Sequence, residues 1–215
     1  MTAAVAPMGS AAPVASAVAA LPVPATPPAA PKHYKLVLHT GDSTVGAVHS
    51  GLSGALERRF DAEGTRYVRE AMESASIAAV AKGKRLRDTI AKHKPDLVIL
   101  TLGTNDVDVP APWALADAVR TIAKRIGEGR DCVWMAPPVW KKDTGIVAVI
   151  RDNATPCAFF DASDLTLERL VDGFHPSDKG GEDWAAAFWA AFRGPDAGTP
   201  LAAPALALPA AAAPR

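Results

Sequence analysis

The chain has 215 residues, of which 49% are hydrophobic, and its 23 basic side chains equal its 23 acidic ones, so the formal net charge is zero. A neutral chain without a long basic stripe argues against a nucleic-acid partner, and the densest basic stretch, 82–87, falls on an expected amphipathic helix, where a solvated face accounts for it. No apolar run is long enough to span a membrane.

Both ends of the chain are rich in alanine and proline, over residues 1–33 and 194–215. Such tracts lack the large apolar side chains that offset ordering entropy, so we predict that both are disordered. About 160 residues remain between them, which suits one domain over 34–193. Prolines interrupt the apolar part of the first tract and a basic n-region is missing. A degenerate export signal, a wrongly chosen start and a linker to an anchor therefore all stay open.

From residue 34 onward, strand and helix patterns alternate along the chain. The run 96–102 is almost uninterruptedly apolar, which is typical of a central parallel strand buried on both faces. The alternation predicts a three-layer α/β/α domain around a five-stranded parallel sheet. We expect strands at 34–40, 65–71, 96–102, 131–136 and 157–161, and helices at 46–60, 77–92, 112–126, 143–153 and 180–193.

Local signals mark the ends of these helices. Gly64 ends the first and Pro95 the second, Pro112 opens the third, and Asp143 is the expected N-cap of the fourth. Two helices carry apolar residues four apart on one face: Leu52, Leu56 and Phe60 in the first, and Trp184, Phe188 and Phe192 in the last.

Three polar clusters interrupt this pattern in a fixed order. Gly-Asp-Ser at 41–43 follows the first strand, Gly-Thr-Asn-Asp at 103–106 follows the third, and Asp-Gly-Phe-His-Pro at 172–176 precedes the last helix. Sites in parallel sheets form beyond the carboxyl ends of the strands, so Ser43 and Asn105 are expected to come together. The clusters supply a nucleophile, an amide donor and a carboxylate near an imidazole, which is the inventory for acyl transfer.

Each residue of this inventory has a specific expected role. Ser43 is the nucleophile and His175 its base, held by Asp172 three residues earlier and restricted by Pro176. Asn105 is a donor to the oxyanion, together with the backbone N–H of Ser43. Each cluster is also compatible with an ordinary turn, a capped loop or a surface histidine.

The other histidines form no cluster with metal-ligand spacing, so we expect neither a metal nor another cofactor. His39 lies in the first strand and is a candidate for a buried, hydrogen-bonded residue near the site. Asp106 either supports its own loop or caps the next helix.

Cys132 and Cys157 each open an expected strand. If the two strands are neighbours, the sulfur atoms lie within disulfide reach, and a bond would close a loop worth roughly 3 kcal/mol. We favour this disulfide over two buried free thiols. It favours an extracytoplasmic location, periplasmic or secreted, with a cytoplasmic one left open.

The motifs resemble those of the SGNH/GDSL hydrolases, over residues 34–193. The first block matches at 41–43, although Thr44 replaces the leucine of the family name, and the third and fifth blocks match at 103–106 and 172–176. The resemblance implies a flavodoxin-like fold and a lipase-like or esterase activity. By the same resemblance, the catalytic triad is Ser43, His175 and Asp172, and the oxyanion hole includes Asn105.

The second block departs from the family pattern. The family has a glycine there whose N–H completes the oxyanion hole, whereas 70–77 contains none. Ala75 is the best-placed substitute, because a backbone N–H survives the exchange if its backbone angles suit alanine. Glu73 or Ser74 could instead contact substrate.

The segment 132–140 is similar to envelope-associated bacterial members of the family, some of which remove O-acetyl groups from polysaccharides. We therefore expect a monomeric esterase for short acyl groups, with a small ester or a glycan as substrate. Trp140 could form a sugar-stacking wall or simply cover apolar surface. A lysophospholipase or thioesterase with a groove of Trp113, Trp140 and Phe174 is the alternative enzyme, and a non-catalytic carbohydrate-binding relative is the other alternative.

Overall fold

The computed structural model describes residues 32–46 and 51–194. The two Ala/Pro-rich tracts fall almost wholly outside these ranges, as do residues 47–50 of the first expected helix. Among the described residues, no helix has both the length and the apolar character that a membrane crossing requires.

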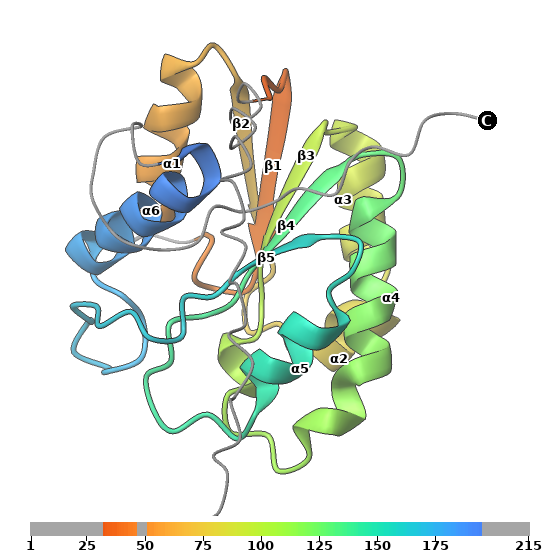
Figure 1. The fold of residues 1–215 in the computed structure, drawn as a ribbon, viewed down its shortest axis with the longest axis vertical. Helices are drawn as coiled ribbons and strands as arrows, with labels where there is room; N and C mark the ends of the chain where they lie inside the picture. Colours follow the sequence, from red (N-terminus) through yellow and green to blue (C-terminus); the bar gives the residue numbers. More distant parts are fainter. Residues whose placement is uncertain (1–31, 47–50, 195–215) are drawn as a thin grey trace, which may run out of the picture. The chain divides into compact units, whose positions relative to one another are not determined.

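A five-stranded parallel sheet forms the middle layer of the described chain, in the order β2-β1-β3-β4-β5 (Figure 1). The fold class predicted from the alternating pattern is confirmed. All five residues of the central strand β3 are buried, as an apolar run flanked on both faces requires. The strands are β1 Leu36–Gly41, β2 Arg66–Ala71, β3 Leu97–Thr101, β4 Asp131–Met135 and β5 Ala158–Phe160.

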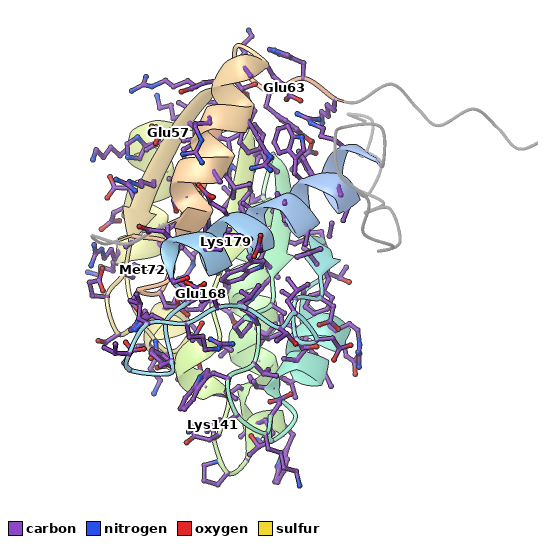
Figure 2. The ribbon with its side chains drawn as sticks, turned by 90° about the vertical axis from the view of Figure 1, so that its left-hand side faces the viewer. Glu57, Glu63, Met72, Lys141, Glu168 and Lys179 are labelled. Carbon is purple, nitrogen blue, oxygen red and sulfur yellow. A yellow bond between two sulfur atoms is a disulfide. The ribbon has the colours of Figure 1, made fainter. Side chains whose placement is uncertain are left out.

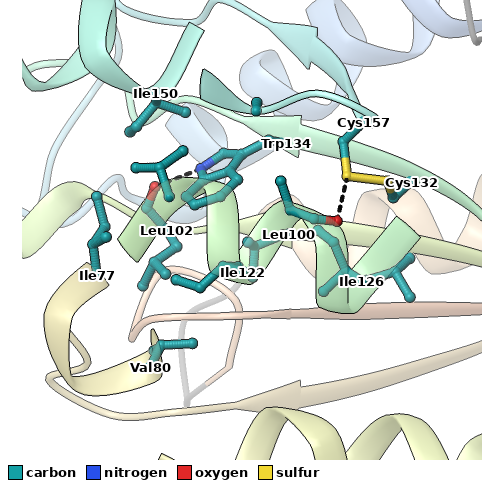
Figure 3. Packing of buried hydrophobic residues seen from close by; sticks show 14 of the residues in the cluster. Ile77, Val80, Leu100, Leu102, Ile122, Ile126, Cys132, Trp134, Ile150 and Cys157 are labelled. Carbon is teal, nitrogen blue, oxygen red and sulfur yellow. Dashed lines mark hydrogen bonds between the residues drawn. A yellow bond between two sulfur atoms is a disulfide. The ribbon is translucent and has the colours of Figure 1, made fainter. Parts of the chain in front are cut away.

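Helices cover both faces of the sheet (Figure 1). One face carries α1 Gly51–Ala62 and α6 Asp178–Arg193, whose apolar stripes bury Phe60, Trp184 and Phe188. On the opposite face the Trp134 ring packs among leucine and isoleucine side chains, and its Nε1–H donates to the Leu102 carbonyl at 2.9 Å (Figure 3). The helices of that face are α2 Ile77–Lys82, α3 Arg85–His93, α4 Ala116–Gly127 and α5 Ile146–Asn153.

The single helix predicted over 77–92 is wrong, because the structure has two helices there. Gly83 adopts an extended conformation (φ −75°, ψ 165°) that ends α2, and α3 begins two residues later. Arg125 of α4 donates to the carbonyls of Val80, Ala81 and Gly83, which satisfies the open end of α2. Leu86 follows Val80 by six residues, which turns it to a different side of a continuous helix, so the helical period is interrupted at this break.

Other helix ends differ from the prediction by a few residues. A 3₁₀ turn, Pro112–Leu115, precedes α4. The carboxylate of Asp143 accepts N–H bonds from Gly145, Ile146 and Val147, so it caps α5 from a position before the N-cap.

Helix α6 also starts earlier than predicted. The hydroxyl of Ser177 accepts the N–H of Gly180 at 3.1 Å, which makes Ser177 its N-cap.

Glycines allow α1 and α6 to approach each other closely at their N-terminal ends. A Cβ atom on Gly51 would lie 2.0 Å from the Asp178 carbonyl oxygen, and one on Gly181 would lie 2.4 Å from the Leu52 nitrogen. Only residues without a side chain fit there. The approach matters because Ser43 lies shortly before α1 and His175 shortly before α6.

A disulfide joins Cys132 of β4 to Cys157, directly before β5 (Figure 3). The favoured pairing of the two cysteines is thus present. The bond lies at the amino ends of the two strands, because Val133 and Ala158 are the first aligned pair of the β4–β5 ladder.

Candidate active site

The site lies where β1, β2 and β3 end together. Gly41 is aligned with Ala71 on one side and with Thr101 on the other, so the loops that follow start side by side. Figure 2 shows Met72 and Glu168, from loops on this side of the sheet, near the middle of the view, with Lys141 below them and Glu63 near the top.

A glycine is required two residues before Ser43. A Cβ atom on Gly41 would lie 1.7 Å from the Thr101 carbonyl oxygen, which no side chain can occupy. The same carbonyl accepts the N–H of Asp42 at 3.0 Å. The chain then turns at once and leaves Ser43 partly exposed at the edge of the sheet.

Asp42 joins the loop at 41–43 to the loop at 103–106. One of its carboxylate oxygens accepts the N–H and the hydroxyl of Thr44, at 3.1 and 2.7 Å, and the other accepts the Thr104 N–H at 3.2 Å. The residue is fully buried, and this burial raises the pKa of its carboxyl above the usual range. Thr44, which replaces the leucine of the family pattern, therefore contributes to holding the carboxylate that sets the Ser43 loop.

Two hydrogen bonds connect the three residues that are expected to form a triad. Ser43 Oγ is 2.9 Å from His175 Nε2, and His175 Nδ1 is 2.9 Å from Asp172 Oδ2. An ionised carboxylate only accepts hydrogen bonds, so Nδ1 carries the ring proton and Nε2 is free to take a proton from the serine.

Backbone N–H groups hold the Asp172 carboxylate in place. Asp172 Oδ1 accepts the N–H groups of Phe174 and His175, at 2.8 and 3.0 Å. The hydrogen bond from the His175 ring, with these two backbone bonds, lowers the pKa of Asp172 to about 2. The Asp172 carboxyl is therefore ionised at neutral pH.

The histidine and its acid lie at the tip of a short β-hairpin, residues 168–177, which we call the catalytic hairpin. Its two arms meet through the Leu170 N–H and the His175 carbonyl, and through the Ser177 N–H and the Glu168 carbonyl, each at 2.9 Å. The hairpin runs directly into α6, so the packing of α6 against α1 sets where the histidine lies.

Asn105 and Ala75 contact each other, but not as the oxyanion-hole expectation requires. One Nδ2–H of Asn105 donates to the Ala75 carbonyl at 2.9 Å, which leaves the second amide N–H for a substrate. The Ala75 N–H donates to the Met72 carbonyl at 3.0 Å.

The expectation that Ala75 offers a free N–H is therefore not met in this structure. Ser74 has a left-handed backbone (φ 56°), and the turn that it makes closes the hydrogen bond between Ala75 and Met72. Glu73 and Ser74 are both exposed beside this turn.

Asp106 connects the 103–106 loop to the start of α2. Its carboxylate accepts the Ile77 N–H at 3.0 Å, so it caps the start of α2, an earlier helix, and not the next helix. Burial raises the pKa of Asp106 to about 6, and the nearby Asp42 carboxylate adds to the shift. Of the two roles considered for Asp106, a cap on the next helix is wrong, and the observed bond instead ties the 103–106 loop to the start of α2.

His39 is a buried structural residue, as expected. Its Nδ1 is 2.6 Å from the Tyr67 hydroxyl and its Nε2 is 2.8 Å from Thr101 Oγ1. Complete burial lowers the pKa of His39 to about 3, so the ring stays neutral. The neighbouring Ser53 is buried too, which keeps this second serine–histidine pair away from substrate.

An aromatic row leads away from the triad. Phe174 packs edge-on against the His175 ring, with the ring centroids 4.3 Å apart. Trp140 packs edge-on against Phe174, with the centroids 4.9 Å apart. The Lys141 Nζ atom lies over the Trp140 ring, 4.1 Å from its centroid, and forms an ion pair with Asp108. One face of Trp140 is therefore occupied, which favours a rim residue over an open stacking surface.

The space directly at the nucleophile is small. A cavity of about 20 Å³ is lined by Ser43 and His175 and also by the buried Trp184. Trp113 is 69% exposed, so it does not line a closed groove. Within residues 32–46 and 51–194, no group of histidine, cysteine or acidic side chains is arranged to hold a metal ion.

Comparison with solved structures gives matches in fold at low sequence identity. A lipase/acylhydrolase from Enterococcus faecalis is 19% identical with a TM-score of 0.59, covering 75% of this chain and 96% of its own. The acetyl xylan esterase AlAXEase is 18% identical with a TM-score of 0.60, covering 73% and 98%.

A family 3 carbohydrate esterase from Clostridium thermocellum is 18% identical with a TM-score of 0.55, covering 72% and 92%. No family model and no curated protein matches the chain. The sheet order, the helical layers and these neighbours agree, and the chain has the three-layer α/β/α, flavodoxin-like fold of the SGNH hydrolases.

Proposed function

We propose that this protein is a serine-dependent carboxylic ester hydrolase for short acyl esters. The observation that carries the proposal is the unbroken relay from Ser43 through His175 to Asp172, with both links at 2.9 Å. Ser43 meets the Asp172–His175 pair from a distant part of the sequence, in the order and spacing that acyl transfer needs.

The reaction follows from this geometry. Ser43 Oγ attacks the ester carbonyl carbon while its proton passes to His175 Nε2, and Asp172 stabilises the imidazolium that results. The same proton then moves to the leaving alkoxide, which departs as an alcohol and leaves an acyl ester on Ser43. A water molecule, deprotonated by His175, attacks this ester and releases the carboxylic acid and the free serine.

Two donors are available to the oxyanion in this proposal. One is the N–H of Ser43 itself, and the other is the second Nδ2–H of Asn105, from the loop that Asp42 joins to the loop of Ser43. Loss of one such donor costs about 10²- to 10³-fold in kcat. The Ala75 N–H can join them only if its turn with Met72 opens when substrate binds.

A short acyl group is favoured by the small cavity at the nucleophile. About 20 Å³ has room for a group the size of a water molecule or a methyl. Two of the structural neighbours carry the names acetyl xylan esterase and carbohydrate esterase. We therefore favour O-deacetylation of an envelope polysaccharide, with Glu73 or Ser74 at the rim as candidate contacts to the sugar.

The disulfide supports an extracytoplasmic location, because disulfides persist mainly in oxidising compartments. We further propose that the enzyme acts as a monomer, without a cofactor, on a small ester or a glycan rather than on a nucleic acid.

The test is hydrolysis of p-nitrophenyl esters from acetate to palmitate by the full chain and by its Ser43→Ala variant. We expect turnover of the acetate ester that the variant lacks, with both proteins equally folded by circular dichroism. The matched control is Ser163→Ala, which should retain full activity. The hydroxyl of Ser163 donates a hydrogen bond to the nearby Asp161 carboxylate.

The other outcomes each point elsewhere. A preference for palmitate would move the assignment to a lysophospholipase or thioesterase. Equal activity of the Ser43→Ala variant would overturn the mechanism. Absence of turnover on any ester would favour a carbohydrate-binding relative without catalysis.

A further inference from the structure

Arg169 joins two loops that meet beside the triad. It lies in the first arm of the catalytic hairpin, and its Nη1–H donates to the Phe174 carbonyl at 2.6 Å. Its Nη2–H groups donate to the carbonyls of Pro138 and Val139, at 3.2 and 3.1 Å. The guanidinium thus connects the hairpin tip to the loop that follows β4.

The first of these bonds is placed where it can orient the base. Phe174 directly precedes His175, so the peptide group whose carbonyl Arg169 holds also contains the N–H that His175 donates to Asp172. A rotation of this peptide would disturb the backbone bond to the acid and the direction of the imidazole together.

The second contact fixes the tip against the rest of the fold. Within the hairpin, the bonds of Asp172 are local and would move with the tip as one body. The bonds from Arg169 to Pro138 and Val139 instead reach a segment about 30 positions away that continues into Trp140. The Trp140, Phe174 and His175 rings pack in a row, and the same guanidinium bonds the carbonyl just before Trp140 and the carbonyl of Phe174.

Arginine is suited to this task because its planar fork presents several N–H groups in fixed directions. The side chain is partly buried, and this burial lowers the pKa of Arg169 while the charge of Asp172 opposes the shift. A lysine has a single nitrogen, so it cannot keep the same geometry to both loops.

We propose that Arg169 is a positioning residue, which clamps the catalytic hairpin to the loop after β4 and keeps His175 Nε2 in line with Ser43 Oγ. The proposal rests on the proposed ester hydrolysis, but its geometry can be tested without any turnover. It assigns to Arg169 a role in kcat rather than in substrate binding.

The kinetic test compares the full chain with Arg169→Ala and Arg169→Lys on the p-nitrophenyl acetate reaction. We expect kcat to fall about 10²-fold in Arg169→Ala with KM within about 3-fold, because a displaced base loses alignment rather than binding. Arg169→Lys should recover part of the loss, and added guanidinium ion should partly rescue Arg169→Ala. Arg151→Ala removes an arginine paired with Asp152 on the surface and should match the unchanged protein.

A second readout needs no substrate. The proton on His175 Nδ1, shared with Asp172, is expected as a downfield proton NMR signal that Asp172→Asn abolishes. In Arg169→Ala this signal should broaden or vanish while the dispersed amide spectrum stays, and Arg151→Ala should keep it. If Arg169→Ala does not fold, Arg169→Lys provides the same comparison.

The two readouts separate the failure of each proposal. An unchanged kcat together with an unchanged downfield signal in Arg169→Ala would overturn the positioning role and leave a purely structural arginine. A protein without ester turnover whose downfield signal still depends on Arg169 would overturn the reaction and keep the clamp.

Discussion

At the residue scale, buried carboxylates set the loops on which the candidate catalytic side chains lie. Asp42 and Asp106 are both buried, and each accepts hydrogen bonds from backbone N–H groups of another loop or helix. The motifs predict Ser43, His175, Asp172 and Asn105, because each chemistry-bearing side chain is part of a local cluster. They do not predict the engaged Ala75 N–H, which depends on the left-handed turn at Ser74.

The buried Asp106 makes stability depend on pH in a defined direction. Its pKa is raised to about 6, whereas an unfolded chain releases this proton near pH 4. Between these values the folded protein holds more protons than the unfolded one, so this residue's contribution to stability falls as the pH rises. Asp106→Asn removes this dependence, so the unfolding free energy of the variant relative to the unchanged protein should rise from pH 4 to pH 7.

Urea unfolding at pH 4, 5, 6 and 7 measures that difference. Replacing the carboxylate also changes the unfolding free energy by an amount that does not depend on pH, for example by weakening the bond to the Ile77 N–H. This constant amount cancels when the differences at the four pH values are compared with one another. A difference that stays constant over this range would show that Asp106 titrates normally.

At the element scale, the strands follow from the sequence better than the helices do. Apolar runs bounded by turn residues predict all five strands to within about two residues, as β3 illustrates. The prediction of one helix over 77–92 misses the break at Gly83, although the six-residue step from Val80 to Leu86 interrupts the helical period. The residue that satisfies the end of α2, Arg125, comes from α4 and gives no signal near the break.

Close contact of α1 with α6 is the element-scale feature on which the site depends. Gly181→Ala would put a methyl group 2.4 Å from the Leu52 backbone nitrogen, so α6 must move away from α1. We expect a loss of about 1–3 kcal/mol in unfolding free energy, with a lower kcat because the catalytic hairpin moves with α6. Thermal unfolding and p-nitrophenyl acetate hydrolysis measure the two effects.

Gly54→Ala is the matched control on the opposing helix. Its Cβ would meet only the Arg58 guanidinium, at 3.6 Å, so the better helix propensity of alanine should stabilise α1 by up to about 1 kcal/mol. Equal stability changes in the two variants would contradict the close-approach explanation.

At the scale of the whole molecule, the sequence predicts the layers and the edge where the site forms, but not the contacts between distant loops. Alternating strands and helices suffice for a parallel sheet, and the sheet then brings Ser43 and Asn105 to one edge. The Arg169 clamp escapes this reasoning, since nothing around Arg169 in the sequence points to the carbonyls of Pro138 and Val139. Such contacts depend on the paths of two loops, which the periodicity of helices and strands does not constrain.

The disulfide lies at the end of the sheet opposite to the site, so stability and activity should respond to it separately. Cys132 and Cys157 are 25 residues apart, and a loop of this length corresponds to roughly 3 kcal/mol of unfolding free energy in the chain-entropy model. The double variant Cys132→Ser, Cys157→Ser should lose about this amount in urea unfolding yet keep its kcat at 25 °C. The unchanged protein in dithiothreitol should behave in the same way, whereas a parallel loss of kcat in the folded double variant would mean that β4 and β5 transmit the change to the catalytic edge.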